Sequence, residues 1–333
     1  MVPKSKVTSF DPKPDDGVMV YQGDPNDLQP CGAFKEMRTF QAPEPVTPTA
    51  TNTPNPQAPT PTAPPPTSTP LPAPSVDRVG FPANYETEFK LLFVFDRPDR
   101  KLVRAICGND LAAQHQEGEP FAYGSVLLMI SYSAKLDVTG QPVLDENGHY
   151  IAQKLVALHV QRKEEGFGEA YGENRAGEWE FVAFNEDGSY QNAPATTNFC
   201  AACHSHDGGE SVDHAFRMHL WYDGDAALVS PPVGENEISI YLYAFHEDVL
   251  EVKVGTTVTW VNNDEASHKV VAAVIDDQGK VVAANEPLFE SPALASVNAQ
   301  PGASFSFTFD KPGEYLYLCT THANEIGKII VTE

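Results

Sequence analysis

The chain has 333 residues, 41% of them hydrophobic, and its 46 acidic and 22 basic residues give a formal net charge of −24 at pH 7. This length and hydrophobic content suit two domains with separate cores, and the strong negative charge excludes nucleic acid and anionic lipid as binding partners. The cysteines number five, and they do not form a disulfide framework because three of them fall into metal or haem patterns.

The N-terminal residues 1–42 show no sustained periodicity, so we expect an irregular segment. They lack the hydrophobic stretch of a signal peptide, and no apolar run in the chain reaches transmembrane length. Cys31, in this segment, and Cys107 belong to no metal pattern. These two cysteines could form a disulfide bond in an oxidising compartment, but the sequence leaves the pairing open because it does not give their geometry.

Residues 43–75 consist mainly of proline, threonine and alanine and contain no lysine or arginine. Such a segment cannot bury enough apolar area to fold, and it predicts a disordered, extended linker. A spacer of this kind implies tethering to a membrane, a cell wall or another domain.

A first folded domain is predicted for residues 76–225. Apolar side chains at helical spacing predict a short amphipathic helix at 84–93. Strand-like runs follow, and turn residues at 145–148 and 185–188 indicate antiparallel hairpins. The runs cover residues 124–132, 150–160 and 178–184. We therefore expect an antiparallel sheet with a few helices.

The motif Cys-x-x-Cys-His at Cys200, Cys203 and His204 is typical of covalent c-type haem attachment. The two thiols would form thioethers with the porphyrin vinyl groups, and the histidine would ligate the iron. Cys-x-x-Cys alone also occurs in redox disulfides and zinc sites, but a zinc site needs a second ligand pair, for which His206 and His214 are the nearby candidates. Haem attachment is the favoured interpretation, and it indicates an exported protein.

The stretch 81–222 resembles the cytochrome P-460 family and its relative cytochrome c′-beta. Four runs in the same order carry the resemblance, at residues 82–85, 121–126, 177–181 and 197–204. It implies a five-coordinate haem with His204 as the proximal ligand and an open distal face that binds small nitrogen species. Some family members oxidise hydroxylamine, and others bind nitric oxide or similar gases.

One position departs from the hydroxylamine-oxidising members of that family. They carry a lysine cross-linked to the porphyrin edge five residues after the glycine that opens the strand, and this chain has Met129 there. Lys135 or Lys154 can substitute only if the register differs. Met129 is expected either to pack in the strand core or to lie over the haem edge in the distal pocket. Met218 is a candidate sixth iron ligand, although packing is its favoured role.

A second domain is predicted for residues 235–333. Polar and apolar residues alternate in several short runs at regular intervals, which favours a Greek-key β-sandwich. These runs cover residues 238–243, 250–260 and 303–309. The fold class predicted for the whole chain is therefore mainly β.

Three residues of this second domain form a copper-ligand pattern. His268 follows a predicted strand, Cys319 ends another, and His322 comes three residues after Cys319. Two imidazoles and one thiolate are the trigonal set of a blue-copper centre. The stretch 235–333 looks like a cupredoxin of the amicyanin and plastocyanin group, on the matching runs at 256–262, 267–268, 317–322 and 327–331.

Glu325 stands where amicyanin-like loops have their axial methionine, and no methionine occurs after Met218. A carboxylate in that place is a harder, anionic ligand that favours Cu(II), lowers the reduction potential and weakens or reddens the blue colour. Alternatively, Glu325 points to solvent, and the copper is three-coordinate or binds water.

These patterns together predict an exported protein with two redox centres, a covalent haem c and a type 1-like copper. The haem domain would bind or convert hydroxylamine or nitric oxide and exchange electrons with the copper; the alternative is a non-catalytic electron carrier or a nitric-oxide-binding protein. Whether the chain is an oxidoreductase stays open. Expected partners are an external electron donor or acceptor protein, a small nitrogen-containing ligand and, by analogy with the family, a second copy in a homodimer. We expect a periplasmic or other extracytoplasmic location, with a membrane tether before the N-terminus.

Overall fold

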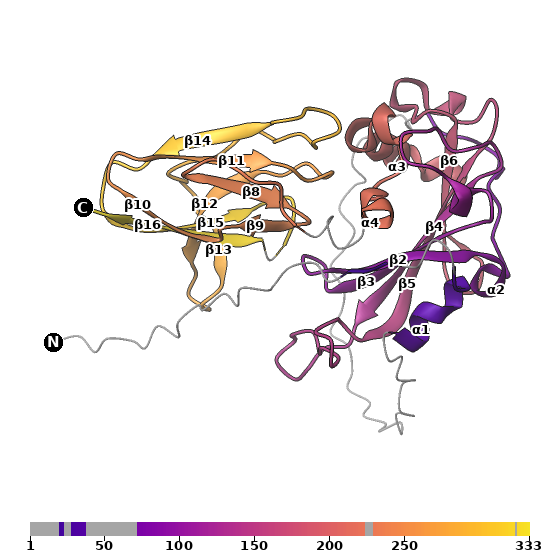
Figure 1. The fold of residues 1–333 in the computed structure, drawn as a ribbon, viewed down its shortest axis with the longest axis horizontal. Coiled ribbons are helices and arrows are strands. Elements are labelled where there is room, and N and C mark those ends of the chain that lie inside the picture. Colours follow the sequence, from indigo (N-terminus) through magenta and orange to yellow (C-terminus); the bar gives the residue numbers. More distant parts are fainter. Residues whose placement is uncertain (1–19, 23–27, 38–71, 224–228, 324) are drawn as a thin grey trace, which may run out of the picture.

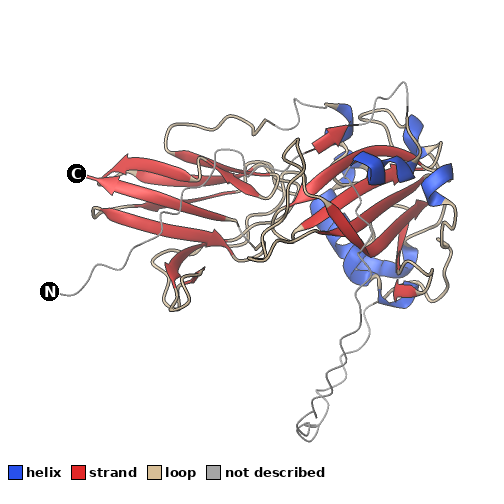
Figure 2. Cartoon of the chain, turned by 90° about the horizontal axis from the view of Figure 1, so that it is seen from below, coloured by secondary structure: helices blue, strands red, loops and turns tan. Residues whose placement is uncertain are grey.

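The computed structural model describes residues 20–22, 28–37, 72–223, 229–323 and 325–333. They form two β-rich parts that lie side by side, with the helices gathered on one of them (Figure 1, Figure 2). We call the described residues up to 223 the N-terminal region and those from 229 onward the C-terminal sandwich. No helix within the described residues has the length and apolar character needed to span a membrane. The linker predicted at 43–75 lies almost entirely outside the described residues.

The N-terminal region contains one antiparallel sheet, in which each strand from β1 to β7 pairs with the next along the chain. The strands are β1 (Val20–Gln22), β2 (Lys90–Arg97), β3 (Leu102–Gly108), β4 (Val126–Ala134), β5 (Ala152–Lys163), β6 (Trp179–Phe184) and β7 (Tyr190–Asn192). The three strand runs predicted in this region correspond to β4, β5 and β6, and the predicted turn at 185–188 joins β6 to β7.

The helix predicted for residues 84–93 is wrong, because α2 (Tyr85–Glu88) is a single turn and β2 begins at Lys90. Leu91 and Leu92 show the reason: they pack into different core clusters. Successive side chains of a strand point to opposite faces of the sheet. When both faces are buried, the apolar run is continuous and its period does not distinguish strand from helix.

Short helical segments pack on both faces of this sheet, and one of them carries the haem motif. Besides α2, they are α1 (Phe34–Met37), α3 (Asn198–Cys203), a π-helical turn (His204–Gly208), α4 (His219–Tyr222) and 3₁₀ turns at Cys31–Ala33, Ala112–Gln114, Glu169–Asn174, Pro194–Thr196 and Glu210–Val212. Ala201 of α3 and Trp221 of α4 join the core cluster that contains Phe93 and Phe181 of the sheet. This face of the sheet is therefore the one that meets the haem motif.

The segment predicted as irregular, residues 1–42, is partly ordered within its described residues. β1 pairs with the edge of β2, and the helical turn at Cys31–Ala33 is tied to β3 by a disulfide bond between Cys31 and Cys107, both fully buried. Their Cα atoms lie 5.8 Å apart, within the usual range for a disulfide. A three-residue strand is too short to leave a periodic signal, so this order is invisible in the sequence pattern.

The C-terminal sandwich consists of two sheets, with strand orders β10-β16-β15-β12-β13 and β14-β11-β8-β9. The strands are β8 (Glu237–Tyr241), β9 (Ala244–His246), β10 (Val249–Lys253), β11 (Thr257–Asn262), β12 (Val270–Ile275), β13 (Val281–Ala283), β14 (Ser304–Thr308), β15 (Gly313–Cys319) and β16 (Ile326–Thr332). The alternating run at 250–260 is two strands in different sheets, because the chain turns at Gly255 with a φ of +86°, a backbone conformation that favours glycine. The predicted mainly β fold, with a sandwich at the C-terminus, is confirmed.

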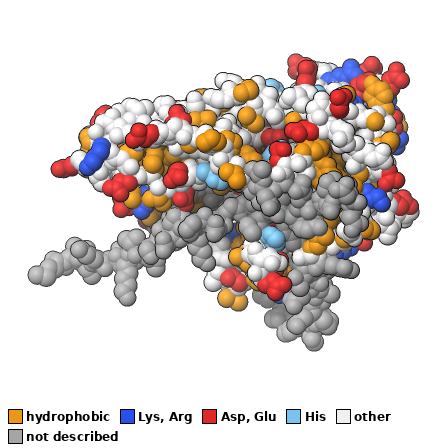
Figure 3. Space-filling view, in the orientation of Figure 1, with side chains coloured by type: hydrophobic (Ala, Val, Ile, Leu, Met, Phe, Trp, Pro, Cys, Tyr) orange, Lys and Arg blue, Asp and Glu red, His pale blue; other side chains and the backbone are white. Residues whose placement is uncertain are grey.

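The two sheets of the sandwich enclose a core of aromatic and branched side chains. Trp260 of β11 and Tyr317 of β15 lie at its centre, fully buried, with their rings 5.2 Å apart and nearly perpendicular. On the outside, acidic side chains are spread over both parts of the molecule on the face shown in Figure 3. The sandwich is thus a rigid support for residues at its ends, beneath an acidic surface.

Candidate haem and copper centres

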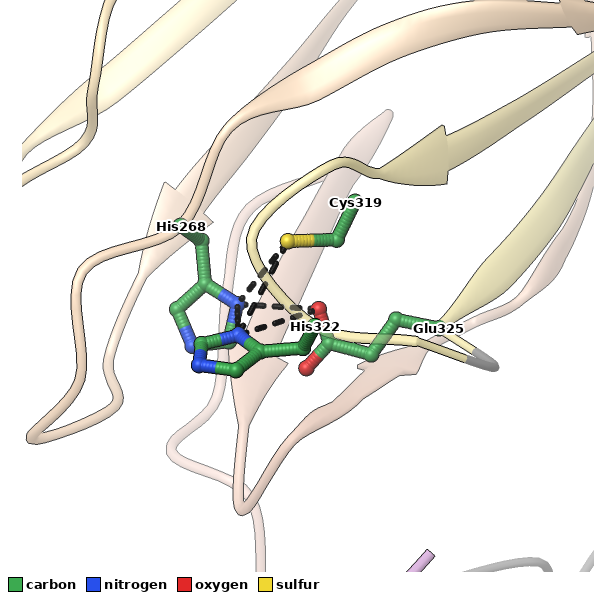
Figure 4. A group of neighbouring side chains, drawn as sticks. All are labelled: His268, Cys319, His322 and Glu325. Carbon is green, nitrogen blue, oxygen red and sulfur yellow. Dashed lines mark hydrogen bonds and ion pairs between the residues drawn. The ribbon is translucent and has the colours of Figure 1, made fainter. Parts of the chain in front are cut away.

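The four predicted copper ligands converge at one end of the C-terminal sandwich (Figure 4). His268 lies two residues before β12, Cys319 is the last residue of β15, and His322 and Glu325 lie in the loop between β15 and β16. Antiparallel pairing of β12 with β15 sets Cys319 opposite Val270 and therefore beside His268. All four side chains are buried, and one ligand atom of each lies within 4.8 Å of the others.

The spacing of these atoms fits a bound metal ion. The Nδ1 atoms of His268 and His322 are 3.2 Å apart, and they lie 3.7 and 3.8 Å from the sulfur of Cys319. A first-row metal about 2.0 Å from each nitrogen and about 2.3 Å from the sulfur would hold such atoms about 3.5 Å and about 3.7 Å apart in a trigonal plane. Two imidazoles and a thiolate are also the donor set that copper prefers.

Glu325 does not point to solvent, since its side chain is buried and its Oε2 atom lies 2.9 Å from Nδ1 of His268 and 3.8 Å from Nδ1 of His322. Its other oxygen, Oε1, is buried without a hydrogen-bond partner. A buried carboxylate oxygen without a partner is costly. The alternative of a solvent-facing Glu325 is therefore wrong, and the carboxylate is available as a fourth ligand.

The electrostatics of this cluster favour a cation. Burial disfavours the thiolate of Cys319, but hydrogen bonds to His268 and His322 outweigh it and lower the pKa of Cys319 to about 7. Burial likewise disfavours the carboxylate of Glu325, but the charge of His268 lowers its pKa below the usual value. The same carboxylate, against the effect of burial, holds the pKa of His268 well above its usual value. Without a metal, protons on the histidines thus stabilise the negative charges of Cys319 and Glu325. A bound metal ion can take over this role when it displaces the protons.

Asp264 orients His268 from behind and was missed in the sequence. Nε2–H of His268 donates to Oδ2 of Asp264 at 3.3 Å, which leaves Nδ1 free for the metal. Asp264 is fully buried and pairs with Arg217 of the N-terminal region, with 2.6 Å between Nη2 and Oδ1. An aspartate four residues before a ligand histidine is a weak signal, and nothing in the sequence shows that Arg217 meets it.

The predicted haem-attachment residues lie together at the end of α3. Cys200 and Cys203 are free thiols on successive turns, and the imidazole of His204 packs against Phe181, with their ring centres 4.5 Å apart. Nδ1–H of His204 donates to the carbonyl of His214 at 2.7 Å. This hydrogen bond fixes the ring and leaves Nε2 free for iron, as is usual for a ligating histidine.

The sheet face toward this motif is less buried at its centre than the opposite face. Met129 of β4 sits between Ile106 of β3 and His159 of β5 in register, and Arg104 lies two residues before Ile106 on the same face. These four side chains are half-buried, whereas the opposite face of the same strands is fully buried. Met129 therefore lies at the centre of a half-buried surface, here called the cradle, on the sheet face that meets the haem motif.

Two polar residues of the cradle, Arg104 and His159, were missed in the sequence. Nε of Arg104 is buried without a partner among the described residues. Burial, together with the charge of Arg104, lowers the pKa of His159 to about 4, so its imidazole is neutral. Side chains alternate between the two faces of a sheet, so Arg104 and His159 can be assigned to the cradle only when the register of β3, β4 and β5 is known. A half-buried cradle with polar side chains, beside two thiols and an oriented histidine, fits a haem.

The remaining candidates have structural roles. Met218 is buried in the core with Trp221, as favoured. His214 donates Nδ1–H to the carbonyl of His204 at 3.1 Å, and Nδ1 of His219 lies 3.2 Å from a carboxylate oxygen of Glu265.

Neither alternative lysine takes the place of Met129. Lys135 follows the end of β4, and Lys154 is exposed on β5, where its backbone pairs with Ser133 at the far end of the sheet. Since the register sets Met129 at the centre of the cradle, a lysine is absent from that position.

The two predicted metal-binding segments touch each other. Oγ–H of Ser267 donates to Oδ1 of Asp207 at 2.8 Å, and Oγ–H of Ser296 donates to the carbonyl of Asp207 at 2.9 Å. Asp207 comes three residues after His204, and Ser267 directly precedes His268. The turn that follows the haem motif and the segment that leads into His268 are therefore in direct hydrogen-bonded contact.

Tyr243 forms a second bridge between the two parts. Its ring is held between the guanidinium groups of Arg97 and Arg217, whose central carbons lie 3.6 and 4.2 Å from the ring centre. Such cation–π contacts are strengthened by burial. The same ring packs edge-on against His322, with 5.1 Å between ring centres. The copper-ligand end of the sandwich is thus covered by the N-terminal region.

Comparison with known proteins assigns both parts. The sequence model of the family "Cytochrome P460" matches residues 82–216, and that of "Copper binding proteins, plastocyanin/azurin family" matches residues 234–332. Amicyanin-alpha of Methylorubrum extorquens is 30% identical over 32% of this chain and 78% of its own length. Halocyanin of Natronomonas pharaonis is 32% identical over 34% of this chain and 64% of its own length.

Among solved structures, a purple cupredoxin from Nitrosopumilus maritimus is 32% identical, over 29% of this chain and all of its own, with a TM-score of 0.24. The predicted resemblances to both families are confirmed by the family matches. The chain belongs to the plastocyanin/azurin family of copper-binding proteins through residues 234–332 and matches the cytochrome P460 family over residues 82–216, so that it is a redox protein with haem c and copper as its cofactors.

Proposed function

We propose that electrons pass between the haem and the copper within this one chain, and that the haem face opposite His204 binds a small nitrogen species. The observation that carries the proposal is the hydrogen bond between Asp207 and Ser267, which joins the turn after the haem motif to the segment that carries the copper ligand His268. When bound, the haem held by Cys200, Cys203 and His204 would supply an iron for ligand binding and electron exchange, and the copper would supply a one-electron couple. Because both sites share one interface, electron exchange needs no dissociable carrier between them.

The residues between the two parts hold the haem and copper sites together and limit the exposure of the copper ligands to solvent. Tyr243, stacked between two arginines, closes the space beside His322, which is only 8% exposed. Arg97 is anchored by a buried pair of hydrogen bonds to Asp99, at 2.7 and 2.5 Å, and donates to the hydroxyl of Tyr243 at 3.0 Å. A buried network of this kind rigidifies the contact when its members are paired, which supports exchange at a fixed separation.

Intramolecular electron exchange is tested by mixing the oxidised holoprotein anaerobically with a reductant that reacts at the haem. We expect the copper absorption to bleach at a rate independent of protein concentration, because donor and acceptor belong to one molecule. Ser267→Ala, which removes the hydrogen bond to Asp207, should slow the bleaching severalfold. The matched control is Thr259→Ala, which removes a hydroxyl pair with Ser306 on the outer face of the sandwich. Copper that stays oxidised, or a rate that rises with protein concentration, would contradict the proposal.

The cradle supports ligand binding rather than hydroxylamine oxidation. Met129 occupies the position where a lysine is needed for the cross-linked haem of the hydroxylamine-oxidising relatives it resembles. Beside it, neutral His159 can donate or accept a hydrogen bond, and Arg104 has an Nε–H group that is buried without a hydrogen-bond partner among the described residues. A nitric-oxide-binding electron carrier is therefore the second candidate function, and the missing lysine is what favours it.

We also propose Glu325 as the fourth copper ligand. Glu325→Gln removes the anionic charge and keeps the shape, so the oxidised-to-reduced copper ratio at a fixed ambient potential should fall about tenfold, which is about 59 mV for a one-electron couple. The control Glu314→Gln removes the same charge from β15, where the side chain is 68% exposed. Redox titration at the copper band checks both. Equal shifts in the two variants would argue against ligation by Glu325.

We place the protein outside the cytoplasm and assign it an external redox partner. The buried disulfide between Cys31 and Cys107 supports an oxidising compartment. The acidic surface favours a neutral or basic partner protein. We also propose 76–225 and 235–333 as the two folded domains, and the family matches at residues 82–216 and 234–332 support this division.

A further inference from the structure

We propose that Arg217, a residue of the N-terminal region, is a positioning residue of the copper centre and raises its reduction potential through Asp264 and His268. The inference rests on the proposed copper ligands but not on electron exchange with the haem. Its physical basis is a chain of contacts across the interface: Arg217 pairs with Asp264 at 2.6 Å, and Asp264 accepts Nε2–H of His268 at 3.3 Å. A group of one domain thereby acts on a metal ligand of the other.

The backbone of Arg217 is held in an uncommon conformation by the sandwich. Its φ is +64°, in the left-handed region that side-chain-bearing residues rarely adopt. Its backbone N–H donates to a carboxylate oxygen of Glu265, next to Asp264. Such a conformation costs about 1–3 kcal/mol and persists where surrounding contacts enforce it. Both the backbone and the guanidinium of Arg217 are thus fixed by the copper-binding side.

The charge of Arg217 balances a carboxylate that would otherwise add to the negative charge at the metal. Asp264 and Glu325 lie on the two nitrogens of one imidazole, Asp264 at Nε2 and Glu325 at Nδ1 of His268. A carboxylate that accepts the outer N–H of a ligand histidine makes it more basic, which favours the oxidised metal. The positive charge of Arg217, paired with Asp264, reduces this increase in basicity. Removal of the Arg217 charge should therefore stabilise Cu(II).

The same interface is also held by a contact that does not involve Asp264. A variant at that contact shows whether a change at the copper comes from the pair of Arg217 and Asp264 or from a loosened interface. Nδ1 of His219 lies 3.2 Å from Glu265. A variant of His219 therefore loosens the interface while leaving the pair of Arg217 and Asp264 intact.

The test uses the full-length holoprotein, with redox titration and electron paramagnetic resonance of the copper. In Arg217→Gln, which keeps an N–H donor toward Asp264 but removes the charge, the oxidised-to-reduced copper ratio at a fixed ambient potential should rise about tenfold, or about 59 mV. Arg217→Lys should restore the ratio to within about threefold of wild type, since the charge returns. The control His219→Gln should leave both the potential and the copper hyperfine splitting unchanged.

A double-mutant cycle covers the case in which Arg217→Gln does not fold. Arg217→Gln/Asp264→Asn leaves no lone buried carboxylate. If the charge of Arg217 acts on the copper through Asp264, the copper potential of this double variant should equal that of Asp264→Asn. An unchanged potential in Arg217→Gln, an equal shift in His219→Gln, or a further shift in the double variant would overturn the inference. Failure of the wild-type protein to bind copper would instead overturn the proposed ligands.

Discussion

Cys319→Ser should abolish the intense visible absorption of the copper-loaded protein. The thiolate of Cys319 is the soft donor of the cluster, its sulfur lies 3.7 and 3.8 Å from the two imidazole nitrogens, and a hydroxyl does not replace its covalency. Loss of an outer-shell partner costs about 10- to 100-fold in metal affinity, so loss of this ligand should cost about 100-fold or more. Absorption spectra and competitive copper titration measure both effects.

The matched control for this variant is Thr321→Ser, an equally small change at an exposed position in the same loop. It should keep the copper absorption and affinity of the wild type. The haem absorption should be the same in all three proteins, because Cys319 is remote from the haem motif in the sequence and lies in the other part of the fold. A serine variant that retains the visible copper band would remove Cys319 from the ligand set.

Removal of the disulfide, in Cys31→Ala/Cys107→Ala, should lower the free energy of unfolding of the N-terminal region by about 2–4 kcal/mol. The bond closes a loop with a sequence separation of 76 residues, and a crosslink over a long loop restricts the unfolded chain strongly. Denaturant unfolding followed by circular dichroism measures the change.

A reductant provides the control for this second variant. It should destabilise the wild type by a similar amount and leave the double variant unaffected, because only the wild type has a bond to reduce. Equal stability of the oxidised wild type and the double variant would mean that β1 and the turn at Cys31–Ala33 are held by other contacts.

The copper ligands could be predicted because their spacing is local. Cys319, His322 and Glu325 fall within seven residues of one another, so a single loop brings them together. His268 joins them through the pairing of β12 with β15, which family resemblance supplies but periodicity does not. The location of Glu325 in the cluster depends on the path of that loop, so the sequence alone left open whether its side chain faces the metal or solvent.

The residues that were missed depend on register and on packing between the two parts. His159 lies in a predicted strand, yet its place beside Met129 follows from a strand register that has shifts at two points. Arg217 and Asp264 are 47 residues apart and meet only across the interface. The failed helix at 84–93 has a different cause, since Leu91 and Leu92 are buried on both faces of a sheet and periodicity cannot then identify a strand.

The order of strands also bears on how the chain folds. β1 to β7 pair with their sequence neighbours, apart from the long connection to β1, so that sheet can grow by successive hairpins. The sandwich pairs β10 with β16, which are far apart in sequence and parallel. Folding slows as contacts become less local. The haem-binding sheet should therefore form before the sandwich closes. The interface around Arg217 and Tyr243 can form only after the sandwich, the slower of the two parts, has folded.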